Sequence, residues 1–131
     1  MARIIVDTSA IYALLDRSDA NHTKAVELLK KMREERRFVT LTNFIVAEAH
    51  ALLLARLGHG LARTWLKNLR WPVEMVVAAD EERAKEIIFT YEDKTFSYTD
   101  ATTFAVMERT GIKTAFAFDN HFLQFGFTLY M

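Results

Sequence analysis

Short apolar segments that end at polar residues alternate with helical patterns along this chain, and this alternation constrains the fold more than any other feature. The segment from Arg3 to Val6 is rich in β-branched residues, stops at Asp7 and is followed directly by apolar residues at helical spacing. Comparable segments predict strands at 38–41, 73–78, 114–118 and 127–130. Strands this apolar have no water-facing side, so the pattern predicts an α/β/α sandwich around a parallel sheet that helices cover on both faces.

Capping residues define the expected ends of the helices between these strands. The predicted helices run from a cap at Asp19 or Asn21 to about Arg37, from Phe44 to Leu57 with Gly58 as the stop, over the amphipathic stretch 60–70, from a cap at Asp80 to about Tyr91, and from Ser97 or Thr99 to Gly111. Each of these helices lies between two predicted strands, as parallel strands require.

Length and residue usage narrow the class of protein. The chain has 131 residues and no internal repeat, which predicts a single domain over residues 1–131. It contains no Cys, which excludes disulfide scaffolds, zinc ribbons and thiol catalysis, and its four Gly and one Pro argue against a loop-rich all-β fold. The most apolar stretch, Ile45 to Leu57, is interrupted by charged residues and cannot span a bilayer. We therefore expect a soluble, cytoplasmic protein with no membrane partner.

The charges of the chain balance in total but not in position. The formal net charge is zero, yet residues 17–70 carry eleven Lys and Arg against five acids, a net charge of +6. Residues 71–131 carry a net charge of −5. A neutral chain can therefore present a basic face, and Arg56, Arg63 and Lys67 are candidates to attract the phosphates of a nucleic acid.

Three aspartates stand at positions where ligands or helix caps are expected. Ligand sites in parallel sheets form beyond the carboxyl ends of the strands, and Asp7 and Asp119 each follow a predicted strand at that end. Either residue could instead cap a helix or form an Asx turn. Asp100 follows Ser97 at the spacing of a capping box. The local pattern leaves both roles open for all three residues.

Glu48 is harder to explain by local structure. It lies three or four residues from Phe44, Ile45 and Leu52, and therefore on the apolar stripe of its helix. A buried carboxylate without a positive partner is unstable as an anion or takes up a proton. No basic residue nearby in the sequence stands at a suitable helical offset. A cation bound from solution would supply the missing charge.

Four carboxylates at one sheet edge would repel one another unless a divalent cation lay among them. Oxygen ligands suit Mg²⁺ or Mn²⁺, and such an ion activates water and stabilises the leaving oxygen of a phosphodiester. Zinc is disfavoured, because the four His show no paired ligand spacing and Cys is absent. We expect His121 in a surface turn. The phenylalanines near it are expected to pack in the core: Phe116, Phe118, Phe122, Phe125 and Phe127.

Four motifs occur in order over essentially the whole chain. They are Ile5-Val6-Asp7-Thr8-Ser9-Ala10, Glu48 in an apolar helix after Thr42-Asn43, Ser97-Tyr98-Thr99-Asp100-Ala101, and Phe118-Asp119-Asn120-His121-Phe122 followed by Gly126-Phe127. With these motifs the chain resembles the PIN-domain ribonucleases, and among them the single-domain VapC toxins of bacterial and archaeal toxin-antitoxin modules. The resemblance implies a compact α/β/α sandwich and cleavage of single-stranded RNA by water that Mg²⁺ or Mn²⁺ activates.

The resemblance also implies roles for individual residues and partners. The acidic quartet of the family corresponds to Asp7, Glu48, Asp100 and Asp119, with Asp7 and Asp100 as the primary metal ligands. Accessory polar positions correspond to Thr8, Ser9, Asn43 and Ser97. The implied partners are single-stranded or structured RNA, a second copy of the chain in a homodimer, and a small antitoxin whose tail blocks the acidic pocket.

Two other functions remain open at this stage. A Mg²⁺-dependent phosphatase would use an aspartate as nucleophile, although Ser9 stands where the second acid of an Asp-x-Asp start is expected. A receiver-like or RNA-binding module would bind its partner without cleaving it. A trapped phospho-enzyme would identify the first function, and RNA or partner binding without metal-dependent cleavage would identify the second.

Overall fold

Five parallel strands form one sheet in the order β3-β2-β1-β4-β5. The computed structural model describes residues 2–131, and its strands are β1 (Arg3–Val6), β2 (Phe38–Thr42), β3 (Val73–Glu74), β4 (Thr114–Phe116) and β5 (Thr128–Leu129). The central strand β1 pairs with β2 on one side and β4 on the other. Its residues Ile4, Ile5 and Val6 are completely buried. A strand with no exposed face must be apolar throughout, which explains the first apolar segment of the sequence.

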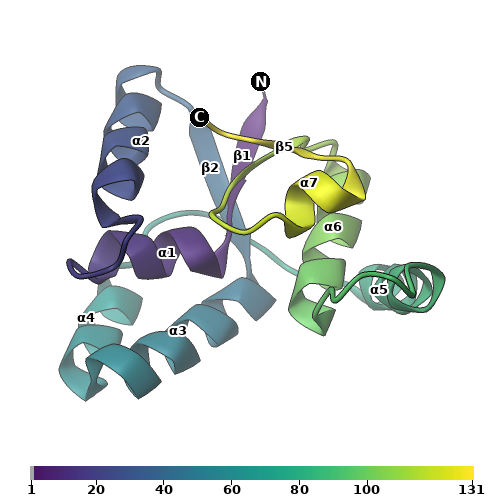
Figure 1. Cartoon of the computed structure of the whole chain (residues 1–131), viewed down its shortest axis with the longest axis horizontal. Coiled ribbons are helices and arrows are strands. Elements are labelled where there is room, and N and C mark those ends of the chain that lie inside the picture. The colour runs from purple at the N-terminus through teal and green to yellow at the C-terminus, as the bar shows by residue number, and fades with distance from the viewer. Residues whose placement is uncertain (1) are drawn as a thin grey trace.

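Helices connect the strands and cover both faces of the sheet. They are α1 (Thr8–Leu15), α2 (His22–Glu34), α3 (Asn43–Leu57), α4 (His59–Asn68), α5 (Ala78–Thr90), α6 (Tyr98–Thr110) and α7 (His121–Phe125). Figure 1 shows α1, α2 and α4 on one side of β1 and β2, and α5, α6 and α7 on the other. The predicted α/β/α sandwich around a parallel sheet is therefore confirmed. Within residues 2–131, every helix is too short or too polar to cross a bilayer.

Three strands are shorter than the sequence predicts. The predicted strand 73–78 pairs with β2 only at Val73 and Glu74, and the predicted strand 127–130 forms β5 only over two residues. The predicted strand 114–118 ends at Phe116, because the Phe118 N–H donates to Ser9 Oγ (3.0 Å). Apolar residues continue past the ladders because their side chains still pack against the core, as Phe118 does.

One helix also ends earlier than predicted. The helix expected to reach Arg37 ends at Glu34. Arg36 adopts a left-handed backbone (φ 54°), and the Arg37 N–H bonds back to the Met32 carbonyl (2.9 Å). These two features close the last turn of α2 and lead the chain into β2.

Aromatic side chains fill the core between α6 and α7. Phe104, Phe116 and Phe122 are among the largest fully buried side chains. Phe104 stacks on Phe125 with ring centroids 4.7 Å apart and meets Phe122 edge-on at 5.3 Å, two arrangements that aromatic quadrupoles favour. The prediction that the phenylalanines of this segment pack in the core is confirmed.

Asp80 and Arg109 tie α5 to α6. The sequence predicts that Asp80 is the cap that precedes α5, but this helix begins at Ala78 and Asp80 lies in its first turn. There the Asp80 carboxylate accepts the Val77 N–H (2.9 Å). Two guanidinium nitrogens of Arg109 donate to the same carboxylate, each at 2.9 Å. Burial opposes the ionisation of Asp80, but the hydrogen bonds from Arg109 and Val77 outweigh it and lower the pKa.

Replacing Arg109 would leave the Asp80 carboxylate, which is 3% exposed, without its cation. We expect Arg109→Ala to lower the free energy of unfolding by about 1–3 kcal/mol, the range for a buried polar group that loses its partner. Urea denaturation measures this loss. Arg83→Ala is the matched control: its pair with Glu108 is 41% and 39% exposed, so the loss should stay below about 1 kcal/mol. Equal losses in the two variants would contradict this account of the α5–α6 contact.

Candidate active site

The order of the strands brings acidic residues to one edge of the sheet. From β1 the chain moves outward to β2 and β3 and later returns to form β4 on the other side of β1. The carboxyl ends of β1 and β4 therefore lie side by side where the winding reverses, the usual position of a ligand site in such sheets. Asp7 follows β1 directly, and Asp119 follows β4 after a short turn. Asp100 joins them from the first turn of α6.

Asp7 is a helix cap and a buried acid at the same time. Its Oδ2 accepts the Ser9 N–H (3.1 Å) and the Ser9 hydroxyl (2.6 Å), which caps α1. Ser9 Oγ in turn accepts the Phe118 N–H (3.0 Å), so this serine links the turn after β1 to the segment that carries Asp119. The accessory role expected for Ser9 therefore has a geometric basis.

The ionisation of Asp7 is strongly disfavoured. Burial is the largest cause, the negative charge of Asp119 is the second largest, and the charge of Asp100 has a smaller effect in the same direction. The hydrogen bonds from Ser9 lower the pKa of Asp7, but the net result is a rise from the ordinary 3.8 to about 7. Only 4% of Asp7 is exposed. The three aspartates thus lie close enough for their charges to oppose one another.

Asp100 and Ser97 form the predicted capping box. The Ser97 hydroxyl accepts the Asp100 N–H, and Asp100 Oδ2 accepts the Ser97 N–H, both at 3.0 Å. The same Oδ2 lies 2.7 Å from His121 Nδ1. This contact lacks the direction of a hydrogen bond, so Nδ1 is buried without a hydrogen-bond partner in the described part of the chain. It is an ion pair when the imidazole is protonated.

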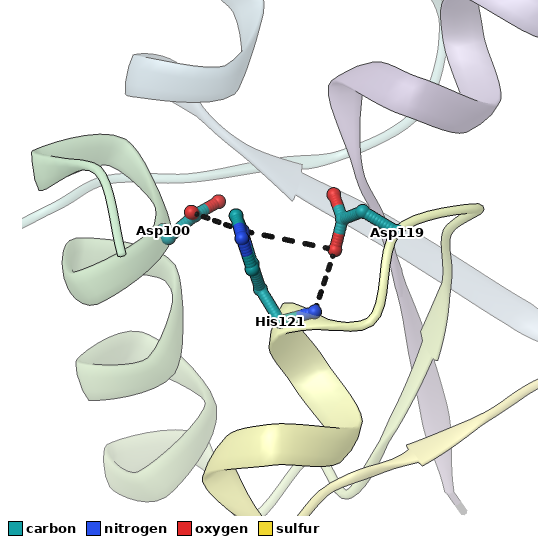
Figure 2. A group of neighbouring side chains, drawn as sticks. All are labelled: Asp100, Asp119 and His121. Carbon is teal, nitrogen blue, oxygen red and sulfur yellow. Dashed lines mark hydrogen bonds and ion pairs between the residues drawn. The ribbon is translucent and has the colours of Figure 1, made fainter. Parts of the chain in front are cut away.

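His121 lies between two of the acids, which the sequence did not predict. Figure 2 shows its ring between Asp100 and Asp119. The backbone N–H of His121 donates to Asp119 Oδ1 (3.0 Å), and the ring atom Nδ1 lies 4.0 Å from the same oxygen. Phe96 meets the ring edge-on at 5.7 Å. The expectation of a surface turn was therefore wrong. The available signal was the Asp119-x-His121 spacing, which allows an Asx turn to place the ring beside the acid.

Two predicted site residues have different surroundings from those expected. Glu48 is partly exposed rather than buried. Neither Glu48 nor Asp7 belongs to the group of Asp100, Asp119 and His121, whose ligand atoms are all within 4.8 Å of one another. The Asn43 side-chain oxygen accepts the Val76 N–H (2.8 Å), so this amide holds the chain after β3 against the start of α3. Asn43 therefore has a structural role that needs no ligand.

The donor set at this edge fits a divalent cation. Within residues 2–131, no Lys or Arg forms an ion pair with Asp7, Asp100 or Asp119. Thr8 Oγ1, next to Asp7, is a second buried polar atom without a hydrogen-bond partner in this range. Mutually repelling carboxylates and a buried hydroxyl are oxygen donors of the kind that suits Mg²⁺ or Mn²⁺ with bound water.

Known sequences similar to this chain act on RNA. A family model described as the PIN domain matches residues 4–128. The 23S rRNA-specific endonuclease VapC20 of Mycobacterium tuberculosis is 37% identical over 128 residues, which is 95% of each protein. Ribonuclease VapC26 of the same organism is 26% identical over 123 residues, covering 91% of this chain and 89% of the relative.

Solved structures share the same fold. The crystal structure of VapC20 from Mycobacterium tuberculosis, described as a sarcin-ricin loop cleaving toxin, matches with a TM-score of 0.84 and 35% identity over 95% of each chain. FitAcB from Neisseria gonorrhoeae matches with a TM-score of 0.68 and 18% identity, over 98% of this chain and 96% of that one. The second similarity is one of fold alone.

The raised pKa of Asp7 predicts how stability depends on pH in the absence of metal. Unfolded Asp7 loses its proton near pH 3.8 and folded Asp7 near pH 7, so the folded state binds more protons between these values and its stability falls as pH rises through that window. Asp7→Asn keeps a capping side chain but has no charge. We expect the variant to gain thermal stability relative to wild type as pH rises from 5 to about 8 in EDTA. A variant that is less stable by the same amount at every pH would contradict this prediction.

Proposed function

This chain belongs to the PIN-domain family and is an endoribonuclease of the VapC type, and we propose that it cleaves a loop of ribosomal RNA with a divalent cation held by its acidic edge. The observation that carries the proposal is the grouping of Asp100 and Asp119 with His121 beyond the ends of β1 and β4, where the charges of both acids also act on Asp7. VapC20, which has 37% identity to this chain, is a 23S rRNA-specific endonuclease. The same substrate class is therefore proposed here.

The metal we propose is Mg²⁺, with Mn²⁺ as a substitute. Asp7, Asp100 and Asp119 would hold it. Glu48 lies outside the group of Asp100, Asp119 and His121 and is proposed only to orient the attacking water. When bound, such an ion lowers the pKa of a water ligand and stabilises the negative charge of the leaving oxygen. Its positive charge would also favour the ionised form of Asp7, whose pKa in the metal-free chain is about 7.

The residues around the acids position them for this role. The Ser9 hydroxyl and N–H fix Asp7 Oδ2, and the Ser97 N–H fixes Asp100 Oδ2. Each of these carboxylates keeps Oδ1 for a further ligand, because no hydrogen bond within residues 2–131 reaches that atom. His121 supplies the local cation between Asp100 and Asp119 when it is protonated.

Replacing a single acid tests the mechanism. We expect Asp100→Asn to reduce RNA cleavage to the level of wild type in EDTA, because the amide cannot supply the charge that holds a divalent cation. Intact ribosomes incubated with Mg²⁺, followed by primer extension over 23S rRNA, measure the cleavage. Asp93→Asn removes the same charge from an exposed loop residue paired with Lys94 and should cleave normally. A fully active Asp100→Asn would overturn the mechanism.

An antitoxin is the protein partner we propose. An apolar groove of about 830 Å³ lies between α1, α2 and α4, and its lining includes Leu14, Leu29 and Trp65, with Arg33 and Arg70 among them. An apolar helix with acidic residues would match both its surface and its charge. A tail from such a partner would reach the acidic edge, since α1 begins directly after Asp7.

The groove predicts which substitution releases the antitoxin. Val26 lines the groove and is 44% exposed, so Val26→Asp should fold normally and place a charge against an apolar partner. We expect the product of the neighbouring reading frame to co-purify with wild type but not with Val26→Asp, and growth inhibition to return in cells that express both. Leu123→Asp, at an equally exposed residue on α7, is the control. Loss of co-purification in both variants would contradict the assignment of the groove.

A homodimer is the remaining partner we propose. Phe89 on α5 is 74% exposed and Leu54 on α3 is 44% exposed. Single exposed apolar side chains are ordinary on a protein surface, so the proposal is that these helix faces contribute to one contiguous apolar surface that a second copy covers. Light scattering of the purified chain distinguishes the dimer from the monomer.

A further inference from the structure

A basic hollow lies on the hairpin of α3 and α4, away from the acidic edge. It is open, has a volume of about 870 Å³, and its cationic and titratable lining residues are His50, His59, Arg63 and Lys67. We name these four residues the basic pocket. Its lining contains no acidic residue. The sequence explains this, because no Asp or Glu occurs between Glu48 and Glu74.

The charges of the basic pocket are not neutralised within the described chain. Across residues 2–131, neither Arg63 nor Lys67 has a carboxylate within ion-pair distance. Within the same residues, the neighbouring Arg56 and Arg70 also lack a carboxylate, but their guanidinium groups have other contacts. The Arg56 guanidinium lies over the Tyr12 ring (5.3 Å), and an Arg70 nitrogen donates to backbone carbonyls at 3.0 and 3.1 Å. Arg63 and Lys67 line the hollow itself, and their charges are available to a ligand there.

Arg63 and Lys67 can act on the same ligand. They stand four residues apart on α4, so their side chains project from the same face of the helix. A guanidinium binds two oxygens of one phosphate in a planar arrangement, and an ammonium adds a second positive charge. A neutral imidazole adds one N–H donor from each of the two histidines. These hydrogen-bond donors, with no negatively charged side chain among them, suit a phosphate.

Helix α3 connects the basic pocket to the acidic edge. It begins at Asn43, directly after β2, and contacts both α1, which begins directly after Asp7, and α6, which carries Asp100 in its first turn. Figure 1 shows α3 running from that point to the turn into α4. His50 is seven residues into the helix, which is about 10 Å along its axis.

We propose that the basic pocket binds a backbone phosphate of the RNA substrate a few nucleotides from the bond that is cut. The inference rests on the proposed function for the identity of the ligand, an RNA. The acidic edge repels phosphates until it holds a cation, so an adjacent cationic site is needed to hold the strand there. A phosphate contact positions the RNA and carries no sequence information. The pocket therefore contributes affinity, and the choice of the cleaved sequence lies elsewhere.

RNA binding by a cleavage-deficient chain tests this proposal. In an Asp100→Asn background, Arg63→Gln with Lys67→Gln should bind a fluorescently labelled 23S rRNA stem-loop several-fold more weakly at low salt. The slope of log Kd against log salt should fall by about 0.7 for each phosphate that the pocket neutralises on a single strand. The matched control is Lys24→Gln with Lys30→Gln, which removes the same charge from exposed positions on α2.

The possible results separate the two proposals. An unchanged affinity and slope in the α4 variant, or equal losses in the α2 control, would overturn the pocket while leaving the proposed function intact. A selective loss would support the pocket even if wild type failed to cut the ribosomal RNA, because binding is measured without cleavage. Thermal melts of both double variants confirm that they are folded. A change of oligomeric state in the α4 variant with RNA binding retained would also overturn the proposal.

Discussion

The burial of a carboxylate at the carboxyl edge of the central strand is the constraint on which the rest of this structure depends. Because β1 is covered on both faces, the residue that follows it has almost no access to water, and Asp7 is 4% exposed. Burial and the charge of Asp119 raise its pKa to about 7. The chain offers this group N–H and O–H donors from Ser9 rather than a Lys or Arg. An edge of this kind is most stable when positive charge comes from outside the protein.

Helix capping and the proposed metal binding use the same carboxylates through different oxygens. Asp7 Oδ2 caps α1, and Asp100 Oδ2 closes the capping box of α6. The turn before α7 uses Asp119 Oδ1 in the same way. A cap fixes the rotamer of its side chain, so it also fixes where the second oxygen lies. The two interpretations that the sequence leaves open for these residues are therefore compatible, and capping becomes a means of aligning the ligands.

The sequence predicts what local periodicity and capping control, and fails where a distant residue decides. The parallel sheet follows from the apolar strands, and Ser97 caps its helix as predicted. The end of β4 depends on a hydrogen bond from Phe118 to Ser9 that no local pattern contains.

The errors at the site have the same origin. The ring of His121 is positioned by Phe96, and the amide of Asn43 by the backbone of Val76, both distant in sequence. Helical periodicity predicted that Glu48 lies on the buried stripe of its helix, but the buried residues of α3 are Ile45, Ala49 and Leu53. Periodicity cannot show which part of an apolar face another element covers.

A neutral net charge likewise conceals an acidic edge and a basic hairpin joined by α3. An enzyme whose metal ligands and substrate are both anions needs this separation of charge. The acids must lie close together to bind a metal ion, and the basic side chains must lie apart from the acids so that they do not form ion pairs with them. Helix α3 contacts α1 and α6, which begin next to Asp7 and Asp100, and leads into α4, which carries Arg63 and Lys67. In the proposed arrangement this helix sets the spacing between the acids that bind the cation and the cations that bind the RNA strand.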